Sequence, residues 1–323
     1  MTDREKIIKR LKEEDKFILI SHMLPDGDSI GSLLAMGEGL RRSGKKVTLI
    51  TPGHIPRKYT FLKGSERVKH EVLIDDPAIP VIVLDSSDPE RLGLLRDEIM
   101  KSSEVFNIDH HVTNQRFGTL NYVDPEAAAT GEIIYHILED LEVEIDENIA
   151  EALYVAISTD TGSFKYDNTT PNTHRVVATL LESGISPGTI SSMIFDERPL
   201  SFYILLKEAL STLELYESRS LAVMTLSKDI KDRSGATSDD LEGIVNYTRN
   251  IEGIELGILF YLDNQGEIKV GFRSKSLDVS ILAGKLNGGG HIRAAGARIE
   301  GDFETVKDKV IAEACKMLKE LSA

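Results

Sequence analysis

Residues 81–111 read VIVLDSSDPERLGLLRDEIMKSSEVFNIDHH, and this stretch decides the fold of the first half of the chain. Its two runs 81–84 and 105–108 are apolar or nearly so, and the segment 89–101 between them has a helical pattern. Short buried strands separated by a crossover helix are typical of a parallel sheet with helices on its faces. The stretch therefore predicts an α/β fold in which each strand ends on polar residues, Asp85 after the first and Asp109-His110-His111 after the second.

The alternation of strands and helices continues on both sides of this stretch. We expect strands at 17–21 and 47–50, and helices that carry Ile30, Leu33, Leu34 and Leu40, then Ile133, Ile134, Ile137 and Leu138, then Ile149, Leu153, Ala156 and Ile157. Thr130 is the expected cap of the second helix, and Asp160 lies on the buried stripe of the third. This order predicts a doubly wound, mostly parallel sheet, in which ligands bind beyond the carboxyl ends of the strands.

The second half of the chain has a different character. Helical segments at 173–183 and 201–209 precede expected strands at 211–216, 221–225, 255–262 and 268–274, a helix at 239–249, a glycine-rich turn at 288–290 and a closing helix from Phe303. This mixture predicts a smaller mixed α/β domain. We therefore expect a first domain at 1–195, a linker at 196–210 and a second domain at 211–323.

Composition narrows the class of protein. The 323 residues are 41% hydrophobic, enough for two cores, and they carry a formal charge of −15 with a single cysteine, Cys315. This net negative charge argues against binding of long duplex DNA, because such binding relies on extended Lys and Arg contacts. With no apolar leader and no 18-residue apolar run, no membrane association is expected. We expect a cytoplasmic protein, and a homodimer is left open.

Acidic and imidazole side chains lie in four segments of the first half, where apolar runs end. Singly, Asp26 and Asp28 could form an ordinary turn, and Asp85 could cap a helix. Three titratable residues in a row, 109–111, rarely serve packing. Together they supply oxygen and imidazole ligands for two metal ions, which suits Mn²⁺, with Mg²⁺ and Co²⁺ as alternatives, better than a thiolate zinc site.

The four segments together resemble the DHH phosphoesterase family. The first motif is His-x-x-x-Asp-x-Asp at 22–28, the second is Asp85 at the end of its strand, the third is 109–111, and the fourth is Asp160 in Ser-Thr-Asp-Thr-Gly. The resemblance implies that His22, Asp26 and Asp85 hold one ion and that Asp28, Asp85, His110 and Asp160 hold the other. It implies catalytic roles for His111, Asp85 and His110, while Asp109 orients the histidines.

The second half resembles the DHHA1 domain, which binds substrate in that family. The match consists of Arg273-Ser274 in Gly-Phe-Arg-Ser-Lys-Ser, and of Gly288-Gly289-Gly290-His291 in Asn-Gly-Gly-Gly-His-Ile-Arg. Glycines let backbone amides approach a phosphate closely, and an arginine can grip a phosphate through two N–H groups. The resemblance therefore implies a phosphate-binding set made of Arg273, Ser274, Gly288, Gly289, Gly290 and His291.

The resemblance is strongest to stand-alone bacterial members that act on short RNA. It implies a Mn²⁺-dependent phosphodiesterase that hydrolyses very short oligonucleotides and linear dinucleotides, such as 5′-phosphorylated diadenylate (5′-pApA), to 5′-mononucleotides through a water activated by two metals. Cyclic diadenylate (c-di-AMP) is a further candidate substrate. In this chemistry the two metal ions activate a bound water and neutralise charge on the leaving group.

Four alternatives stay open. One is a 3′-phosphoadenosine 5′-phosphate phosphatase as the main activity, and another is hydrolysis of inorganic or polyphosphate. A single-strand exonuclease of the RecJ kind needs a basic track with aromatic side chains, which a chain of −15 charge without tryptophan does not suggest. A non-catalytic nucleotide sensor is the alternative from a different class, and the presence of every motif residue disfavours it.

Overall fold

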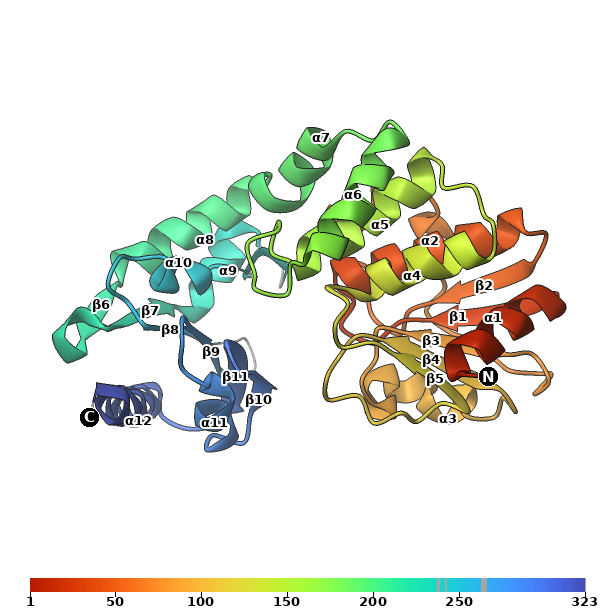
Figure 1. Cartoon of the computed structure of the whole chain (residues 1–323). Coiled ribbons are helices and arrows are strands. Elements are labelled where there is room, and N and C mark those ends of the chain that lie inside the picture. The colour runs from red at the N-terminus through yellow and green to blue at the C-terminus, as the bar shows by residue number, and fades with distance from the viewer. Residues whose placement is uncertain (237–238, 242, 263–265, 323) are drawn as a thin grey trace. The chain divides into compact units, whose positions relative to one another are not determined.

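The computed structural model describes residues 1–236, 239–241, 243–262 and 266–322, and it divides into two compact units (Figure 1). Unit 1 extends from Met1 to Glu197, and unit 2 begins at Arg198. Among the described helices, none has the length and the apolar character that crossing a bilayer requires.

Unit 1 contains a sheet of five parallel strands in the order β2-β1-β3-β4-β5. The strands are β1 (Lys16–Ile20), β2 (Lys46–Ile50), β3 (Val81–Leu84), β4 (Val105–Asp109) and β5 (Leu120–Val123). The α-helices are α1 (Asp3–Glu13), α2 (Gly27–Arg42), α3 (Arg96–Ile99), α4 (Thr130–Asp140), α5 (Glu147–Asp160), α6 (Pro171–Glu182) and α7 (Pro187–Ser191). Short 3₁₀ turns η1 (Arg57–Tyr59), η2 (Ser65–Arg67) and η3 (Pro89–Leu95) and the π-turn η4 (Ser192–Asp196) complete the unit. The predicted doubly wound parallel sheet is confirmed.

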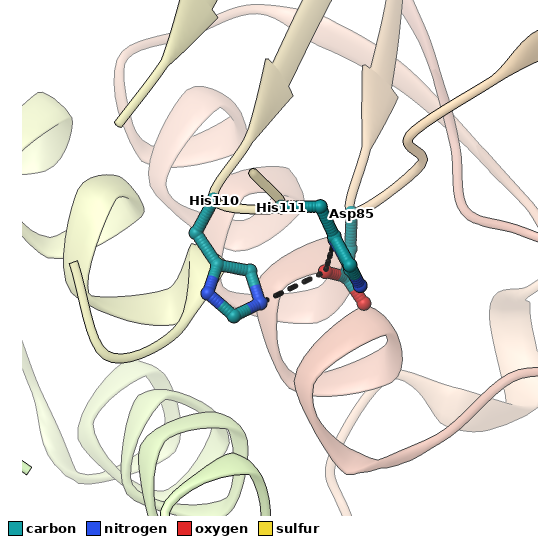
Figure 2. Close-up of side chains that lie close together, drawn as sticks. All are labelled: Asp85, His110 and His111. Carbon is teal, nitrogen blue, oxygen red and sulfur yellow. Dashed lines mark ion pairs between the residues drawn. The ribbon is translucent and has the colours of Figure 1, made fainter. Parts of the chain in front are cut away.

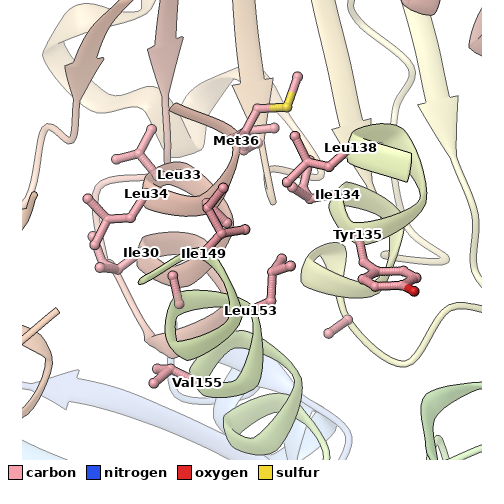
Figure 3. Close-up of a cluster of buried hydrophobic side chains, with 14 of the residues drawn as sticks. Ile30, Leu33, Leu34, Met36, Ile134, Tyr135, Leu138, Ile149, Leu153 and Val155 are labelled. Atoms are coloured by element: carbon pink, nitrogen blue, oxygen red, sulfur yellow. The ribbon is translucent and has the colours of Figure 1, made fainter. Parts of the chain in front are cut away.

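Both faces of this sheet are buried, as its side-chain alternation requires. In β1, Phe17 and Leu19 belong to the large core on the side of α2, α4 and α5, whereas Ile18 and Ile20 belong to a smaller core with Leu92 and Ile99. Successive side chains of a strand point to opposite faces, so a strand that is apolar throughout needs a cover on each side. Figure 3 shows the larger core, where side chains of α2, α4 and α5 meet.

The crossover between β3 and β4 differs from the prediction. A single helix was expected at 89–101, but the chain forms the 3₁₀ turn η3 and then only one turn of α-helix, α3. Gly93 explains the break, because its φ of 57° and ψ of −136° lie outside the helical region. Leu92 and Ile99 on either side still bury their side chains under the sheet.

Unit 2 contains a mixed sheet of six strands in the order β10-β11-β9-β8-β7-β6, in which only the described β7–β8 pair is parallel. The strands are β6 (Glu214–Tyr216), β7 (Leu221–Leu226), β8 (Leu256–Leu262), β9 (Ile268–Ser274), β10 (Gly289–His291) and β11 (Ala294–Ile299). The helices are α8 (Leu200–Ser211), α9 (Lys228–Ser234), α10 (Asn246–Arg249), α11 (Val279–Gly284) and α12 (Phe303–Ser322), with the 3₁₀ turns η5 (Glu217–Arg219) and η6 (Asp239–Leu241). The predicted mixed α/β domain is confirmed.

Three local details of unit 2 differ from the sequence expectations. The expected helix at 239–249 is divided into η6 and α10, and Gly243 between them has a φ of 89°. The expected strand at 211–216 begins only at Glu214, because α8 continues to Ser211. The glycine-rich turn expected at 288–290 is largely strand, because β10 begins at Gly289. The expected helix at 201–209 is present within α8, in the segment proposed as a linker, and its Phe202 and Leu205 pack in one core with β7 and β8.

Candidate metal centre

The acidic and imidazole side chains of the four motifs lie at one edge of the sheet of unit 1. His22 follows β1, Asp85 follows β3, and Asp109 ends β4, directly before His110 and His111. Because the carboxyl ends of neighbouring parallel strands lie at the same edge, these side chains are brought together by the fold alone.

Two helices add the remaining carboxyl groups. Asp26 is the N-cap of α2 and accepts a hydrogen bond from the Ser29 amide at 3.0 Å, and Asp28 lies in the first turn of the same helix. Asp160 is the last residue of α5. The first turn of α2 and the last turn of α5 therefore meet the strand ends at the same edge.

Close packing of glycines allows these elements to approach. A Cβ atom on Gly27 would lie 2.3 Å from Thr159 Oγ1, and one on Gly131 would lie 2.5 Å from the Ala156 Cβ. Both contacts are with α5, so a larger side chain at either position would push α2 or α4 away from the helix that carries Asp160.

The donor atoms form three overlapping groups, each within 4.8 Å: His22, Asp26 and Asp85; Asp28, His110 and Asp160; and Asp85, His110 and His111. His22 Nε2 lies 3.4 Å from Asp85 Oδ2 and 3.7 Å from Asp26 Oδ2. His110 Nε2 lies 3.4 Å from Asp160 Oδ2, 3.7 Å from Asp28 Oδ2 and 3.8 Å from Asp85 Oδ1. Figure 2 shows that the ion pairs of His110 and His111 both end on one oxygen of Asp85, which is Oδ1, whereas Oδ2 lies nearest His22. The two oxygens of Asp85 therefore face different imidazoles.

The spacing of these side chains suits ligands of a shared cation better than it suits direct hydrogen bonds between them. His22 is 1% exposed, and neither of its ring nitrogens has a hydrogen-bond partner. Two ligands that each lie about 2.1 Å from one ion are roughly 3 to 4 Å apart, whereas a good hydrogen bond is no longer than about 3.2 Å. The separations of 3.4 to 3.8 Å between His22, Asp85 and His110 donors and their neighbours agree with that spacing. An orphaned buried imidazole beside carboxyl oxygens is thus consistent with a divalent metal.

The pKa values of the carboxyl groups are also consistent with a divalent metal. Burial and the nearby Asp85 and Asp160 raise the pKa of Asp28 well above its usual range. Burial also raises the pKa of Asp160 to about 6, together with the charges of Asp85 and Asp26 and against the effect of His110. Burial opposes ionisation of Asp85 too, but the imidazoles of His22, His111 and His110 outweigh it and lower its pKa. The cluster holds an excess of acid that a bound cation would offset.

Asp85 also has an unusual backbone conformation. Its φ is 57°, in the left-handed region that residues other than glycine rarely adopt. Such conformations cost of the order of 1–3 kcal/mol and persist where the surroundings hold them. The alternative that Asp85 caps a helix does not apply, because the N-cap of η3 is Asp88.

Asp109, which was predicted to orient the histidines, contacts one of them, His111. It is fully buried and accepts hydrogen bonds from His111 Nδ1 at 2.7 Å and from Asn114 Nδ2 at 2.6 Å. Burial alone would raise the pKa of Asp109, but the bond from His111 lowers it below its usual value. Burial would lower the pKa of His111, but Asp109 and Asp85 raise it to about 9. Asn114 was not identified from the sequence, where an Asn in a loop gives no distinguishing signal.

The segment from Ala127 to Gly131 is a second feature that the sequence interpretation missed. The amides of Thr130 and Gly131 donate to Asp28 at 2.7 and 2.9 Å, and the Thr130 hydroxyl donates to Asp85 Oδ1 at 3.0 Å. The prediction that Thr130 caps α4 was wrong: Ala129 is the N-cap residue and makes no side-chain cap bond. The first amides of a helix attract carboxylates, and here Asp28 occupies them from another helix. A run of small residues before an apolar helix was the available signal.

The predicted phosphate-binding residues of unit 2 lie on β9 and β10, with Gly288 directly before β10, and β11 lies between these two strands. Arg273 on β9 pairs in register with Ala294 on β11, which pairs with His291 on β10. Asn246, which the sequence interpretation also missed, accepts a hydrogen bond from Arg273 Nε at 3.1 Å, and Arg273 Nη1 donates to the Phe272 carbonyl at 2.8 Å. The guanidinium is therefore held at the start of α10.

The other predicted residues of this set have varied surroundings. Ser274 is 1% exposed, and its hydroxyl donates to the Leu277 carbonyl at 2.5 Å. Gly288 and Gly290 allow close strand contact, since a Cβ on them would lie 2.2 Å from the Gly296 oxygen and 2.5 Å from the Ala295 Cα. A Cβ on Gly289 would meet nothing within 4 Å. The side chain of His291 lies outside the part of the chain that the structure describes.

Two family patterns match the chain, one in each half. The pattern of the DHH family, N-terminal domain, matches residues 16–157, and that of the DHHA1 domain matches residues 219–321. The chain is 34% identical over 302 residues to the bifunctional oligoribonuclease and PAP phosphatase NrnA of Thermus thermophilus, covering 92% of this chain and 89% of that protein. It is 29% identical to the protein of the same name from Bacillus subtilis over 320 residues, which are 98% of this chain and 99% of the relative.

A solved structure is similar to this chain over nearly its whole length. An exopolyphosphatase-related protein from Bacteroides fragilis superposes with a TM-score of 0.90 at 26% identity, covering 99% of this chain and 97% of the other. Sequence patterns, full-length relatives and architecture coincide, so this chain belongs to the DHH phosphoesterase family and carries a DHHA1 domain in its second half.

Proposed function

We propose that this protein is a two-metal phosphodiesterase that hydrolyses very short oligoribonucleotides and linear dinucleotides, such as 5′-pApA, to 5′-mononucleotides. The observation that carries the proposal is the overlap of three donor groups through Asp85 and His110. A site with shared ligands can hold two ions close together, as hydrolases of phosphate diesters use them.

The ligand assignment follows the distances. His22, Asp26 and Asp85 Oδ2 would hold one ion. A second set would hold the other ion: Asp28, Asp85 Oδ1, His110 and Asp160. All these donors are oxygens or imidazole nitrogens, which favours Mn²⁺ and leaves Mg²⁺ and Co²⁺ as alternatives. When bound, the pair would supply an activated water and would neutralise charge on the phosphate.

The protein's own side chains have separate tasks in this proposal. Asp85 bridges the two ligand sets, because its two oxygens face His22 and His110 respectively. His111, which Asp109 holds through Nδ1, would contact the scissile phosphate or protonate the leaving oxygen. Asp109 and Thr130 touch no substrate in this scheme and fix the orientation of His111 and Asp85.

The substrate class rests on unit 2 and on the relatives. Arg273, held by Asn246, offers a guanidinium for a terminal phosphate, and Gly289 leaves open space beside the β10–β11 hairpin. The names of the two relatives from Thermus and Bacillus combine oligoribonuclease with PAP phosphatase, so we include 3′-phosphoadenosine 5′-phosphate as a second substrate. Both substrates carry a phosphate ester that can be hydrolysed and a further phosphate group.

A substrate panel tests the proposal. The full-length protein with Mn²⁺ is given 5′-pApA, c-di-AMP, 3′-phosphoadenosine 5′-phosphate, polyphosphate and RNA of two to twenty nucleotides, and the products are separated by chromatography. We expect 5′-pApA and dinucleotide RNA to be hydrolysed with the highest kcat/KM. Equal kcat/KM for a twenty-nucleotide RNA would refute the preference for short substrates and favour an exonuclease of the RecJ kind.

The panel also separates the remaining alternatives. Faster phosphate release from polyphosphate than from any nucleotide would favour an activity like that in the name of the Bacteroides relative. Tight binding of 5′-pApA without any turnover at saturating Mn²⁺ would favour a nucleotide sensor.

A further inference from the structure

The backbone of Ala128 is held by side chains on both sides. Its N–H donates to Glu132 Oε2 at 3.3 Å, and its carbonyl accepts from Asn168 Nδ2 at 2.9 Å. Asn168 Nδ2 also lies 3.2 Å from the carbonyl of Asp160. Side chains that bind both the N–H and the carbonyl of Ala128 leave this buried residue little freedom to move.

Ala128 belongs to the segment that orients three of the proposed ligands. The Ala127 carbonyl lies 3.3 Å from His110 Nδ1, the Thr130 amide binds Asp28, and the Thr130 hydroxyl binds Asp85. A shift of the segment at Ala128 would therefore move partners of His110, Asp28 and Asp85 together.

Glu132 is the least expected member of this arrangement. Its side chain is 3% exposed, in the first turn of α4, and burying a carboxyl group is costly unless it is well bonded. Besides Ala128, Oε2 accepts from the Thr173 hydroxyl at 3.0 Å, and Oε1 accepts from Asn172 Nδ2 at 2.5 Å. Glu132 thus joins the start of α4 to the start of α6.

We propose that Glu132 is a positioning residue for the metal centre, acting through the segment from Ala127 to Gly131. This inference rests on the proposed function, because it assumes that the centre binds a divalent ion. Every contact of the Glu132 carboxyl oxygens is an acceptor contact: with an amide, a hydroxyl and a side-chain NH₂. Glutamine has the same shape but offers one NH₂, which would face at least one donor in either orientation.

The test compares Glu132→Gln with Glu139→Gln. Glu139 lies on the same helix with its side chain half exposed, bonded to His136 at 3.0 Å, and serves as the matched control. The metal-depleted full-length proteins are titrated with Mn²⁺ and free Mn²⁺ is followed by electron paramagnetic resonance, with thermal unfolding measured in parallel. We expect Mn²⁺ binding by Glu132→Gln to be about 10- to 100-fold weaker, the range known for groups that orient ligands, and the control to stay within twofold. Excess Mn²⁺ should restore most of the lost turnover.

Two outcomes would overturn the proposal. One is Mn²⁺ binding by Glu132→Gln within twofold of the wild type. The other is a lowered Tm with unchanged Mn²⁺ affinity of the folded protein, which would make the role purely structural. If Glu132→Gln does not fold, Asn172→Ala decides in the same assay, because it removes one of the three donors to the Glu132 carboxyl group and should weaken Mn²⁺ binding by a smaller factor. Failure of the wild type to bind Mn²⁺ would instead refute the proposed function itself.

Discussion

Replacing Thr130 by valine should weaken the metal centre while leaving the fold intact. Thr130 is fully buried, and its hydroxyl donates to Asp85 Oδ1 at 3.0 Å. Valine keeps the branched shape and the backbone amide that binds Asp28 at 2.7 Å, so the loss is confined to one hydrogen bond. The variant therefore isolates the orientation of Asp85.

The expected magnitude follows from the kind of bond that is lost. A hydrogen bond to a charged group contributes about 1.5–3 kcal/mol, which corresponds to roughly a 10- to 150-fold change in an equilibrium or a rate. Loss of groups that orient metal ligands costs about 10- to 100-fold in metal affinity or activity, in the same range. We therefore expect kcat/KM for 5′-pApA and Mn²⁺ affinity together to fall by one to two orders of magnitude.

The assay needs a control for the loss of a buried hydroxyl as such. Thr248 in unit 2 is also fully buried, and its hydroxyl donates to the Val245 carbonyl, so Thr248→Val removes a comparable group far along the chain. Mn²⁺ affinity is measured by titration of the metal-depleted proteins and kcat/KM by product chromatography. If Thr130→Val keeps both within twofold of the wild type, Thr130 does not orient Asp85 and the reasoning is refuted.

Four further predictions concern separate parts of the molecule. Asp85→Asn should reduce turnover by at least about 10³-fold, because it affects both ligand sets, and unchanged hydrolysis in a product assay would contradict the assignment. Asn246→Ala should raise KM for 5′-pApA more than it lowers kcat, since it releases the Arg273 guanidinium; an effect on kcat alone would argue against a phosphate-binding role. Mn²⁺ at 100 times its Kd should stabilise the folded protein by about 2.7 kcal/mol, seen as a raised Tm that a chelator reverses, and a Tm independent of Mn²⁺ would contradict a metal centre. Asp146→Ala should cost about 1 kcal/mol at pH 7, because Asp146 caps α5 and pairs with Arg42. Burial would raise the pKa of Asp146, but the Ile149 amide and Arg42 hold this pKa below its usual value. The contribution of Asp146 to folding stability is therefore fully present above the unfolded pKa of about 3.9, and it is lost as the pH falls through the folded pKa. A difference in urea unfolding that persists undiminished at pH 2.5 would contradict the pairing.

The fold and the meeting of the proposed metal ligands could be predicted because they depend on local pattern and on one general rule. Apolar runs such as Val81–Leu84 identify buried strands, and parallel strands place whatever follows them at one edge. The chain distance between His22 and His110 is therefore no obstacle to predicting that they converge. Where a single residue breaks a pattern the prediction failed, as at Gly93, whose effect on the helical segment depends on its φ.

The residues that hydrogen-bond to the proposed ligands could not be predicted in the same way. Thr130 before an apolar helix gives the local signal of an N-cap, and only the placement of Asp28, 102 residues away in the chain, decides that the helix amides are bound from outside. Gly288 and Gly290 suggest a phosphate loop by sequence, but close approach to β11 requires them in any case. Local sequence fixes the type of contact a residue can make, while the partner is chosen by tertiary structure.

The hydrogen bonds of Asp28 show how partners from elsewhere in the chain determine which of its carboxyl oxygens keeps an unused lone pair. Its Oδ1 accepts from the Gly131 amide at 2.9 Å and from the Ser32 hydroxyl at 3.0 Å, which occupies both lone pairs of that oxygen. Its Oδ2 accepts one bond, from the Thr130 amide at 2.7 Å, and this oxygen is the one that lies 3.7 Å from His110 Nε2. The remaining lone pair of Asp28 therefore belongs to the atom nearest the other proposed ligands. The start of α4 both stabilises the buried carboxyl group and selects the oxygen that can bind a metal.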